Sequence, residues 1–131
     1  YSALGESDEK MLLARAIQMF MPGKPQIWYL DLFAGKNDHE AVRRAGESGH
    51  KEINRTNLST DQITEGLKKD VVQKQLALIR MRNTHKAFSE GAEVAISGGE
   101  SSLEIRWEYH SAFATLYVNF ESGTYTIVES R

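Results

Sequence analysis

The spacing of apolar residues changes once along this chain, near Phe88, and that change limits the folds open to it. Before Phe88, apolar residues form runs of helical length, as from Met11 to Met21 and from Val71 to Met81. After Phe88, apolar and polar residues alternate, which is typical of half-buried strands. The sequence therefore predicts an α+β chain, with helices first and a small antiparallel sheet last.

Four strands are predicted for the last part of the chain, in the order of a meander. His110-Ser111 is a candidate two-residue hairpin loop, and Ser122-Gly123 is a second turn. The outer strands are expected at residues 92–96 and 124–128. The residues that share a face within each central strand are Leu103, Ile105, Trp107 and Tyr109, and then Ala112, Ala114, Leu116, Val118 and Phe120.

Three aromatic residues of these strands, Trp107, Tyr109 and Tyr125, are candidates for a sugar-stacking platform. Aromatic residues in strands are more often core or cross-strand packing. We therefore interpret them as packing residues and keep sugar binding as the alternative.

The first helix is expected to begin at Ser7 or Asp8 and to end before Pro22. Pro22 lacks a backbone N–H and biases Met21 away from helical geometry, while Gly23 suits the turn that follows. This helix is apolar on most of its circumference, so it needs cover on more than one side. The rest of the chain looks too small to supply that cover, which predicts exposed apolar surface and self-association through it.

A short apolar run, Ile27 to Leu30, follows Pro25 and predicts a buried parallel strand. Asp31 comes at the end of this strand, where α/β proteins place their functional residues. Asp31 is therefore a candidate site carboxylate, with a capping or loop role as the alternative.

Residues 34–58 form a long polar segment with a short helix expected around Asp38 to Arg44. Its histidines, His39 and His50, have no acidic residue at helical spacing with both, so no metal site is predicted. Two further helices are expected at about 60–67 and 70–84. Their starts resemble capping boxes, formed by Ser59 with Gln62 and by Asp70 with Gln73.

Composition excludes several classes of partner. The net charge is −2 and the sequence pI is about 6.1, which gives no basic surface for nucleic acid or an anionic membrane. Cysteine is absent, which excludes disulfides and thiolate metal sites and fits a cytoplasmic protein. No run reaches the about 18 apolar residues of a membrane span, and no signal peptide is visible. The 131 residues begin with Tyr1, so we expect a piece of a longer protein.

Several motifs together resemble a known enzyme family. The run from Ala14 to Gln18 and the run from Pro22 to Tyr29 resemble the last barrel helix and strand of the α-amylase clan, glycoside hydrolase family 13. The resemblance narrows to the sucrose phosphorylase branch and covers nearly the whole chain. The motifs that narrow it are Ala34-Gly35-Lys36-Asn37-Asp38, Glu52-Ile53-Asn54-Arg55, Val71-Val72 and Arg82-Asn83.

This resemblance implies a complete enzyme with a (β/α)₈ barrel and a C-terminal β domain. Residues 1–86 would be an incomplete C-terminal portion of the barrel, and residues 87–131 the antiparallel domain. Such enzymes transfer glucose from an α-glucoside to phosphate with retention, without a cofactor, through a carboxylate nucleophile and an acid/base. The family places those groups, and the phosphate ligands, before the segment that matches Tyr1. No catalytic residue is therefore assigned here, and the chain alone is expected to be inactive.

Lys51 is the one substrate-binding residue that the resemblance assigns. Sucrose phosphorylases carry an arginine here, which reaches the glucosyl unit, whereas this chain has lysine. Lysine offers a compact charge rather than a planar fork, so this departure speaks against sucrose as the donor. It favours another α-glucoside, such as glucosylglycerate, as the alternative to sucrose. A free-standing carbohydrate-binding or interaction module remains the alternative. An open reading frame that continues upstream of Tyr1 would favour the enzyme.

Overall fold

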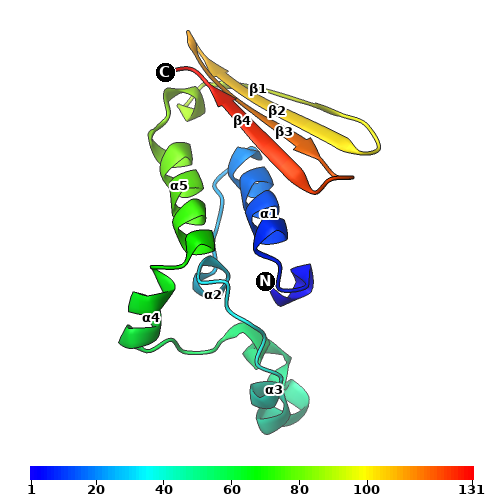
Figure 1. The fold of residues 1–131 in the computed structure, drawn as a ribbon, viewed down its shortest axis with the longest axis vertical. Helices are drawn as coiled ribbons and strands as arrows, with labels where there is room; N and C mark the ends of the chain where they lie inside the picture. Colours follow the sequence, from blue (N-terminus) through cyan, green and yellow to red (C-terminus); the bar gives the residue numbers. More distant parts are fainter.

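The computed structural model describes residues 1–131, the side chain of Ser48 excepted. Helices occupy the first two thirds of the chain and a sheet the last third, which confirms the α+β prediction (Figure 1). The helices are α1 (Asp8–Phe20), α2 (Tyr29–Leu32), α3 (His39–Ala45), α4 (Thr60–Gly66) and α5 (Asp70–Thr84), with 3-10 segments η1 (Ser2–Leu4), η2 (Gly46–Asn54) and η3 (Lys86–Phe88). The strands are β1 (Glu93–Gly98), β2 (Ser102–Tyr109), β3 (Ala112–Asn119) and β4 (Thr124–Glu129). None of the helices described is long and apolar enough to cross a membrane.

The sheet is the predicted meander, antiparallel throughout in the order β1-β2-β3-β4. The loop between β2 and β3 consists of His110 and Ser111, and His110 has φ 54°, as the first position of a tight hairpin turn requires. The inner face is apolar along its length. One row across it is Ile96, Ile105, Leu116 and Ile127, which pair in register.

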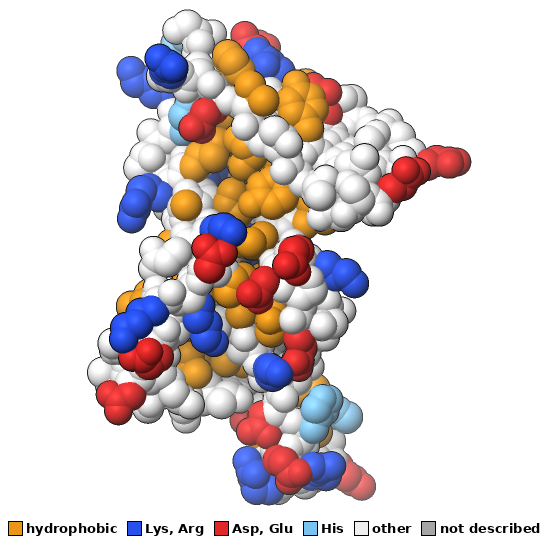
Figure 2. Space-filling view, viewed as in Figure 1, with side chains coloured by type: hydrophobic (Ala, Val, Ile, Leu, Met, Phe, Trp, Pro, Cys, Tyr) orange, Lys and Arg blue, Asp and Glu red, His pale blue; other side chains and the backbone are white. Residues whose placement is uncertain are grey.

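One hydrophobic core joins the helices to the sheet. It contains Ala16, Met19 and Phe20 of α1, Leu78 of α5, Ala87 of η3 and the inner residues of β2 and β3. In Figure 1, α1 and α5 lie side by side below the sheet, and Figure 2 shows hydrophobic side chains at the junction. The sheet is therefore stabilised by helices from the other end of the chain.

Trp107 is part of this core and not of a sugar platform. Only 8% of the residue is exposed, and its indole N–H donates a hydrogen bond of 2.6 Å to the carbonyl of Phe20. The ring of Phe88 packs against both aromatic rings. Its centroid lies 5.3 Å from that of Phe20 and 5.4 Å from that of Trp107. Packing was the favoured interpretation of this aromatic residue, and the structure confirms it.

Helix α1 begins and ends as predicted. The Ser7 hydroxyl accepts a hydrogen bond from the backbone N–H of Lys10 at 3.2 Å, and Met21 is extended, with ψ 144°, ahead of Pro22. The expectation of an uncovered helix is wrong, because the sheet and α5 fold over it. Its core residues Met11, Ala16, Met19 and Phe20 are each 4% exposed or less. Leu12, Leu13 and Ile17 are only half-buried, and self-association through α1 stays a prediction.

The strand predicted at Ile27–Leu30 is absent. Residues 24–28 have no regular structure, and Tyr29–Leu32 form the short helix α2. A parallel strand needs neighbours for its N–H and C=O groups, and no strand of the described part lies beside this segment. The backbone instead closes on itself, with Gly35 N–H donating to Leu30 O at 2.8 Å. Leu30 alone of the segment is buried.

The helices that follow carry one capping box and not two. At α4, Gln62 N–H donates to the Ser59 hydroxyl at 3.2 Å and Ser59 N–H to Gln62 Oε1 at 2.8 Å, as predicted. At α5 the cap residue is Lys69 and no side chain caps it. The second capping box is wrong because the chain enters α5 one residue earlier than the pattern assumed.

Candidate functional site

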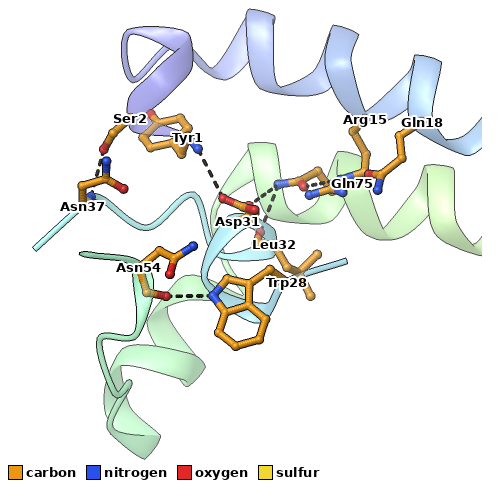
Figure 3. Close-up of polar contacts among 10 residues, drawn as sticks. All are labelled: Tyr1, Ser2, Arg15, Gln18, Trp28, Asp31, Leu32, Asn37, Asn54 and Gln75. Atoms are coloured by element: carbon orange, nitrogen blue, oxygen red, sulfur yellow. Dashed lines mark hydrogen bonds and ion pairs between the residues drawn. The ribbon is translucent and has the colours of Figure 1, made fainter. Parts of the chain in front are cut away.

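Two segments meet around the Lys51 loop, which we define as residues 46–56. Three backbone carbonyls near its end accept hydrogen bonds of 2.7 Å from residues 28–38. Asp38 N–H donates to Ile53 O, the Trp28 indole N–H to Asn54 O, and the Tyr29 hydroxyl to Thr56 O. Figure 3 shows the Trp28 indole pointing at the Asn54 carbonyl. The Glu-Ile-Asn-Arg motif is thus held by its main chain.

The start of the same loop lies against α3, and a glycine makes this possible. Gly49 is buried, and a Cβ there would lie 2.5 Å from the carbonyl oxygen of Val42 and 2.9 Å from the Cβ of Ala45. Asp38 begins α3 by accepting a hydrogen bond of 2.8 Å from Ala41 N–H. Asp38 therefore has a structural role as a helix cap.

Lys51 itself is exposed on the last turn of η2. The next acidic residue, Glu52, forms an ion pair of 3.5 Å with Arg55, one turn later. Figure 2 shows charged side chains of both signs crowded over α3 and η2 at the lowest part of the molecule. Lys51 thus lies on a charged, open surface. The main chain of its loop is anchored a few residues later, at Ile53, Asn54 and Thr56.

Asp31 lies in α2 and not at the end of a strand, so that part of the prediction is wrong. Its carboxylate is 3.3 Å from the backbone nitrogen of Tyr1. The backbone carbonyls of Asp31 and Leu32 accept hydrogen bonds of 3.4 and 3.0 Å from the amide of Gln75 (Figure 3). These bonds from Gln75 give the Asp31 backbone a structural role, whereas the role of its carboxylate stays a prediction.

A buried polar pair fixes α2 to the helices behind it. Gln75 of α5 is fully buried, and its Oε1 accepts a hydrogen bond of 2.9 Å from Nε of Arg15, which is 5% exposed. Burial lowers the pKa of the Arg15 guanidinium, and the negative charge of Asp31 opposes that shift. Gln75 could have been found from the sequence, because it shares a helix face with Val71, Val72 and Leu78.

Arg82 joins the turn after α1 to the sheet. Its guanidinium lies 4.2 Å from the Trp107 ring centroid and 4.7 Å from that of Phe88, and Nη2 donates to Gly23 O at 3.0 Å. Burial lowers the pKa of this arginine. Arg82 lies in the last turn of α5, but its guanidinium stacks on aromatic rings and is not simply solvated. Arg82 also lines a cavity of about 720 Å³ between the Pro-Gly turn and the end of α5.

The described histidine, aspartate and glutamate side chains form no group of three that could hold a metal ion. His39 and His50 are both exposed, the first on α3 and the second on η2. The candidate site is therefore the Lys51 loop with its anchors Trp28, Tyr29 and Asp38.

Comparison with known proteins identifies the kind of enzyme to which such a loop belongs. No model of a protein family matches the chain. Among curated proteins, it is 51% identical over 127 residues to a sucrose 6(F)-phosphate phosphorylase of Ilumatobacter coccineus, covering 97% of this chain and 24% of that protein. It is 41% identical to a sucrose phosphorylase of Agrobacterium vitis, over 99% of this chain and 26% of the relative. A glucosylglycerol phosphorylase of Marinobacter adhaerens is 37% identical, over 99% of this chain and 27% of that protein.

A solved structure agrees over the whole chain. The crystal structure of sucrose 6F-phosphate phosphorylase from Thermoanaerobacter thermosaccharolyticum matches with a TM-score of 0.91 and 39% identity, covering 100% of this chain and 26% of that one. The chain thus spans about a quarter of the length of the proteins it matches. It corresponds to the C-terminal portion of a sugar phosphorylase. More particularly, it matches the C-terminal part of enzymes of the sucrose phosphorylase type, as its motifs indicated.

Proposed function

We propose that the complete enzyme is a sucrose phosphorylase-like retaining glucosyltransferase, which converts an α-glucoside and phosphate to glucose 1-phosphate. The observation that carries this proposal is the match to a solved phosphorylase over 100% of the chain at 39% identity. In the proposal the enzyme is a (β/α)₈ barrel of glycoside hydrolase family 13, in the α-amylase clan. Residues 1–86 are proposed to be an incomplete, C-terminal portion of that barrel, and residues 87–131 the antiparallel C-terminal domain of the enzyme. The lack of cysteine fits the cytoplasm as its location.

The catalytic carboxylates are proposed to lie outside this chain. A retaining enzyme needs two carboxyl groups about 5–5.5 Å apart, one on each side of the anomeric carbon. Two acidic residues beside Lys51 have structural partners instead. Asp38 caps α3, and Glu52 pairs with Arg55. This chain is therefore proposed to contribute substrate contacts and no reacting group.

Lys51 is the residue proposed to contact the glucosyl unit of the donor. Its exposure on an anchored loop supports the proposal, because a fixed main chain with a free cationic side chain suits a ligand in front of it. Sucrose 6F-phosphate is the first donor to consider, since two relatives at 51% and 39% identity carry that name. Sucrose, glucosylglycerate and glucosylglycerol are the other candidates. The lysine in place of arginine favours the two glycerate and glycerol glucosides over sucrose.

The test is an assay of the purified full-length protein. Glucose 1-phosphate is measured with inorganic phosphate and each of sucrose 6F-phosphate, sucrose, glucosylglycerol and glucosylglycerate. Phosphate-dependent release from at least one donor is expected. Release of glucose alone, or no turnover of any of the four, would contradict the proposal.

Lys51→Ala in the same protein tests the binding role. A charge-assisted hydrogen bond to a sugar hydroxyl is lost, which should lower kcat/KM by about ten- to a hundredfold. Lys68→Ala is the matched control, because Lys68 is exposed on another surface and pairs with Glu65. If Lys51→Ala stays within about twofold of the parent for every accepted donor, Lys51 is not a site residue. If Lys51→Arg improves sucrose over the preferred donor, the residue helps to set donor choice.

A further inference from the structure

Trp28 and Tyr29 are adjacent aromatic residues whose side chains both bind the main chain of the Lys51 loop. Each donates its one polar hydrogen, at 2.7 Å, to a backbone carbonyl of the Lys51 loop, at Asn54 and at Thr56. Their rings lie against each other, with centroids 5.0 Å apart. Because both acceptors belong to the main chain, these contacts fix the path of the loop whatever side chains it carries.

The loop needs such anchors because its own structure is weak. Nine residues of it form η2, a 3-10 segment, and such helices rarely persist beyond three or four residues because their hydrogen bonds are strained. Glycines stand at positions 46 and 49, and most of the described residues from 46 to 55 are exposed. Without contacts from outside, the segment that carries Lys51 would sample several conformations.

The anchors themselves rest on the core. Trp28 and Tyr29 begin α2, whose Leu30 is 3% exposed and whose carbonyls at Asp31 and Leu32 are held by Gln75. Gln75 is in turn held by Arg15. A continuous set of contacts therefore runs from α1 and α5, through α2, to the loop (Figure 3). The rings remain 44% and 37% exposed, so their removal should disturb the loop more than the core.

We propose that Trp28 and Tyr29 are positioning residues, which hold the Lys51 loop through the carbonyls of Asn54 and Thr56 and thereby set how tightly the enzyme binds its glucoside donor. This inference rests on the proposed function, because it takes Lys51 as the group that contacts the sugar. It assigns a role in binding to two residues that touch neither the donor nor the reacting atoms.

The experiment compares Trp28→Phe and Tyr29→Phe in the full-length protein, since phenylalanine keeps a ring and loses the donor. Tyr117→Phe is the matched control, because Tyr117 is 44% exposed on the outer face of the sheet. The first measurement is tryptic cleavage after Lys51 and Arg55 under native conditions, followed by mass spectrometry. Each anchor variant should be cut about three- to tenfold faster than the parent, the range expected for losing one hydrogen bond. Unchanged cleavage overturns the proposal.

The second measurement separates positioning from a general loss of structure. In each anchor variant KM for the donor should rise about three- to tenfold while kcat stays within about twofold, and Tyr117→Phe should change neither. A combined Tyr29→Phe, Lys51→Ala variant should bind the donor no worse than Lys51→Ala alone, because the hydroxyl acts through Lys51. Additive losses overturn the proposal, and so does an unchanged KM in a variant whose loop is cut faster.

The two proposals fail in different ways. A parent enzyme that releases no glucose 1-phosphate from any donor removes the proposed function, and with it the role in donor binding. An active parent whose anchor variants have the parent's KM leaves the proposed function standing and removes this inference alone. Trp28→Phe and Tyr29→Phe remove separate hydrogen bonds, so if one variant does not fold, the other decides this inference by the same two measurements.

Discussion

A few polar side-chain atoms join the helical part of this molecule to its sheet. The indole N–H of Trp107 satisfies the last carbonyl of α1, at Phe20, and the Arg82 guanidinium covers the same indole ring. The first contact satisfies a buried carbonyl that the end of α1 would otherwise leave without a partner. At this scale the alternation of apolar residues explains why Trp107 faces inward, and the hydrogen bond explains why the residue is tryptophan.

Trp107→Phe should therefore destabilise the chain beyond the loss of apolar area. The Phe20 carbonyl is left buried and unpaired, which costs about 1–3 kcal/mol in the free energy of unfolding, and part of the Arg82 stacking is lost as well. Urea unfolding followed by circular dichroism measures the difference. Tyr117→Phe is the control, because that residue is 44% exposed and its change should alter stability by less than about 0.5 kcal/mol. Equal effects at the two positions would contradict this account.

The burial of Tyr125 should make the free energy of unfolding depend on pH in the alkaline range. Burial raises the pKa of its phenol, and the charge of Lys74 partly offsets that shift. In the unfolded chain the pKa of a tyrosine is about 10. A raised folded pKa means that the stabilisation is fully present below that pH and is lost as the pH rises through the folded value. Tyr125→Phe should thus reduce the fall in unfolding free energy between about pH 9.5 and 11. Identical slopes for the two proteins would show that Tyr125 is not the cause.

Among the elements, α2 shows most clearly how surroundings override a local pattern. Its sequence, Tyr29-Leu30-Asp31-Leu32, reads as the end of an apolar strand, yet it forms a helical turn that is held by Gln75 and Arg15. The polar pair is buried and connects three helices, since Arg15 lies on α1 and Gln75 on α5. Such a pair stabilises only while both partners are present.

Gln75→Leu should be among the most damaging single changes in the helical part. Leucine fills a similar volume but leaves the Arg15 Nε and the Leu32 carbonyl without partners, at a cost of about 3 kcal/mol or more in unfolding free energy. Gln73→Leu is the matched control, because Gln73 is exposed on the same helix. Thermal unfolding compares the two variants. If Gln75→Leu melts within about 2 °C of the parent, as a change within a few tenths of a kcal/mol would, the pair does not hold α2.

At the scale of the whole molecule, one hydrophobic core is shared by the helices and the sheet. Residues of α1, α5 and the sheet bury one another, so the sheet and the helices are expected to fold together and to unfold together. The proposed boundary at residues 86–87 is crossed by this core. The division into barrel portion and β domain therefore remains a proposal about the complete enzyme rather than a description of two independent units.

The chain by itself should be folded and catalytically inactive. Asp38 and Glu52 are engaged in structural contacts, and the resemblance places the nucleophile and the acid/base elsewhere. Loss of such groups commonly costs many orders of magnitude in rate. Purified 131-residue material is assayed with phosphate and each candidate donor. Glucose 1-phosphate that appears in proportion to the amount of this chain would contradict the prediction.

Features that depend on near neighbours could be predicted from the sequence. The caps at Ser7 and Ser59, the end of α1 before Pro22 and the hairpin at His110-Ser111 each involve residues within a few positions of one another. The four-strand meander followed from alternation and turns alone. These interactions are local, so the residues that decide them are visible together in the sequence.

Tertiary structure alone decided the rest. Residues 29–32 form a helical turn whose carbonyls Gln75 holds, and Gln75 became a link because α1 and α2 came to lie beside it. Lys51 was found through resemblance, but its anchors were not, because Trp28 and Tyr29 bond to residues 26 and 27 positions away. Hydrogen bonds over such separations depend on how the elements pack, and no spacing in the sequence records them.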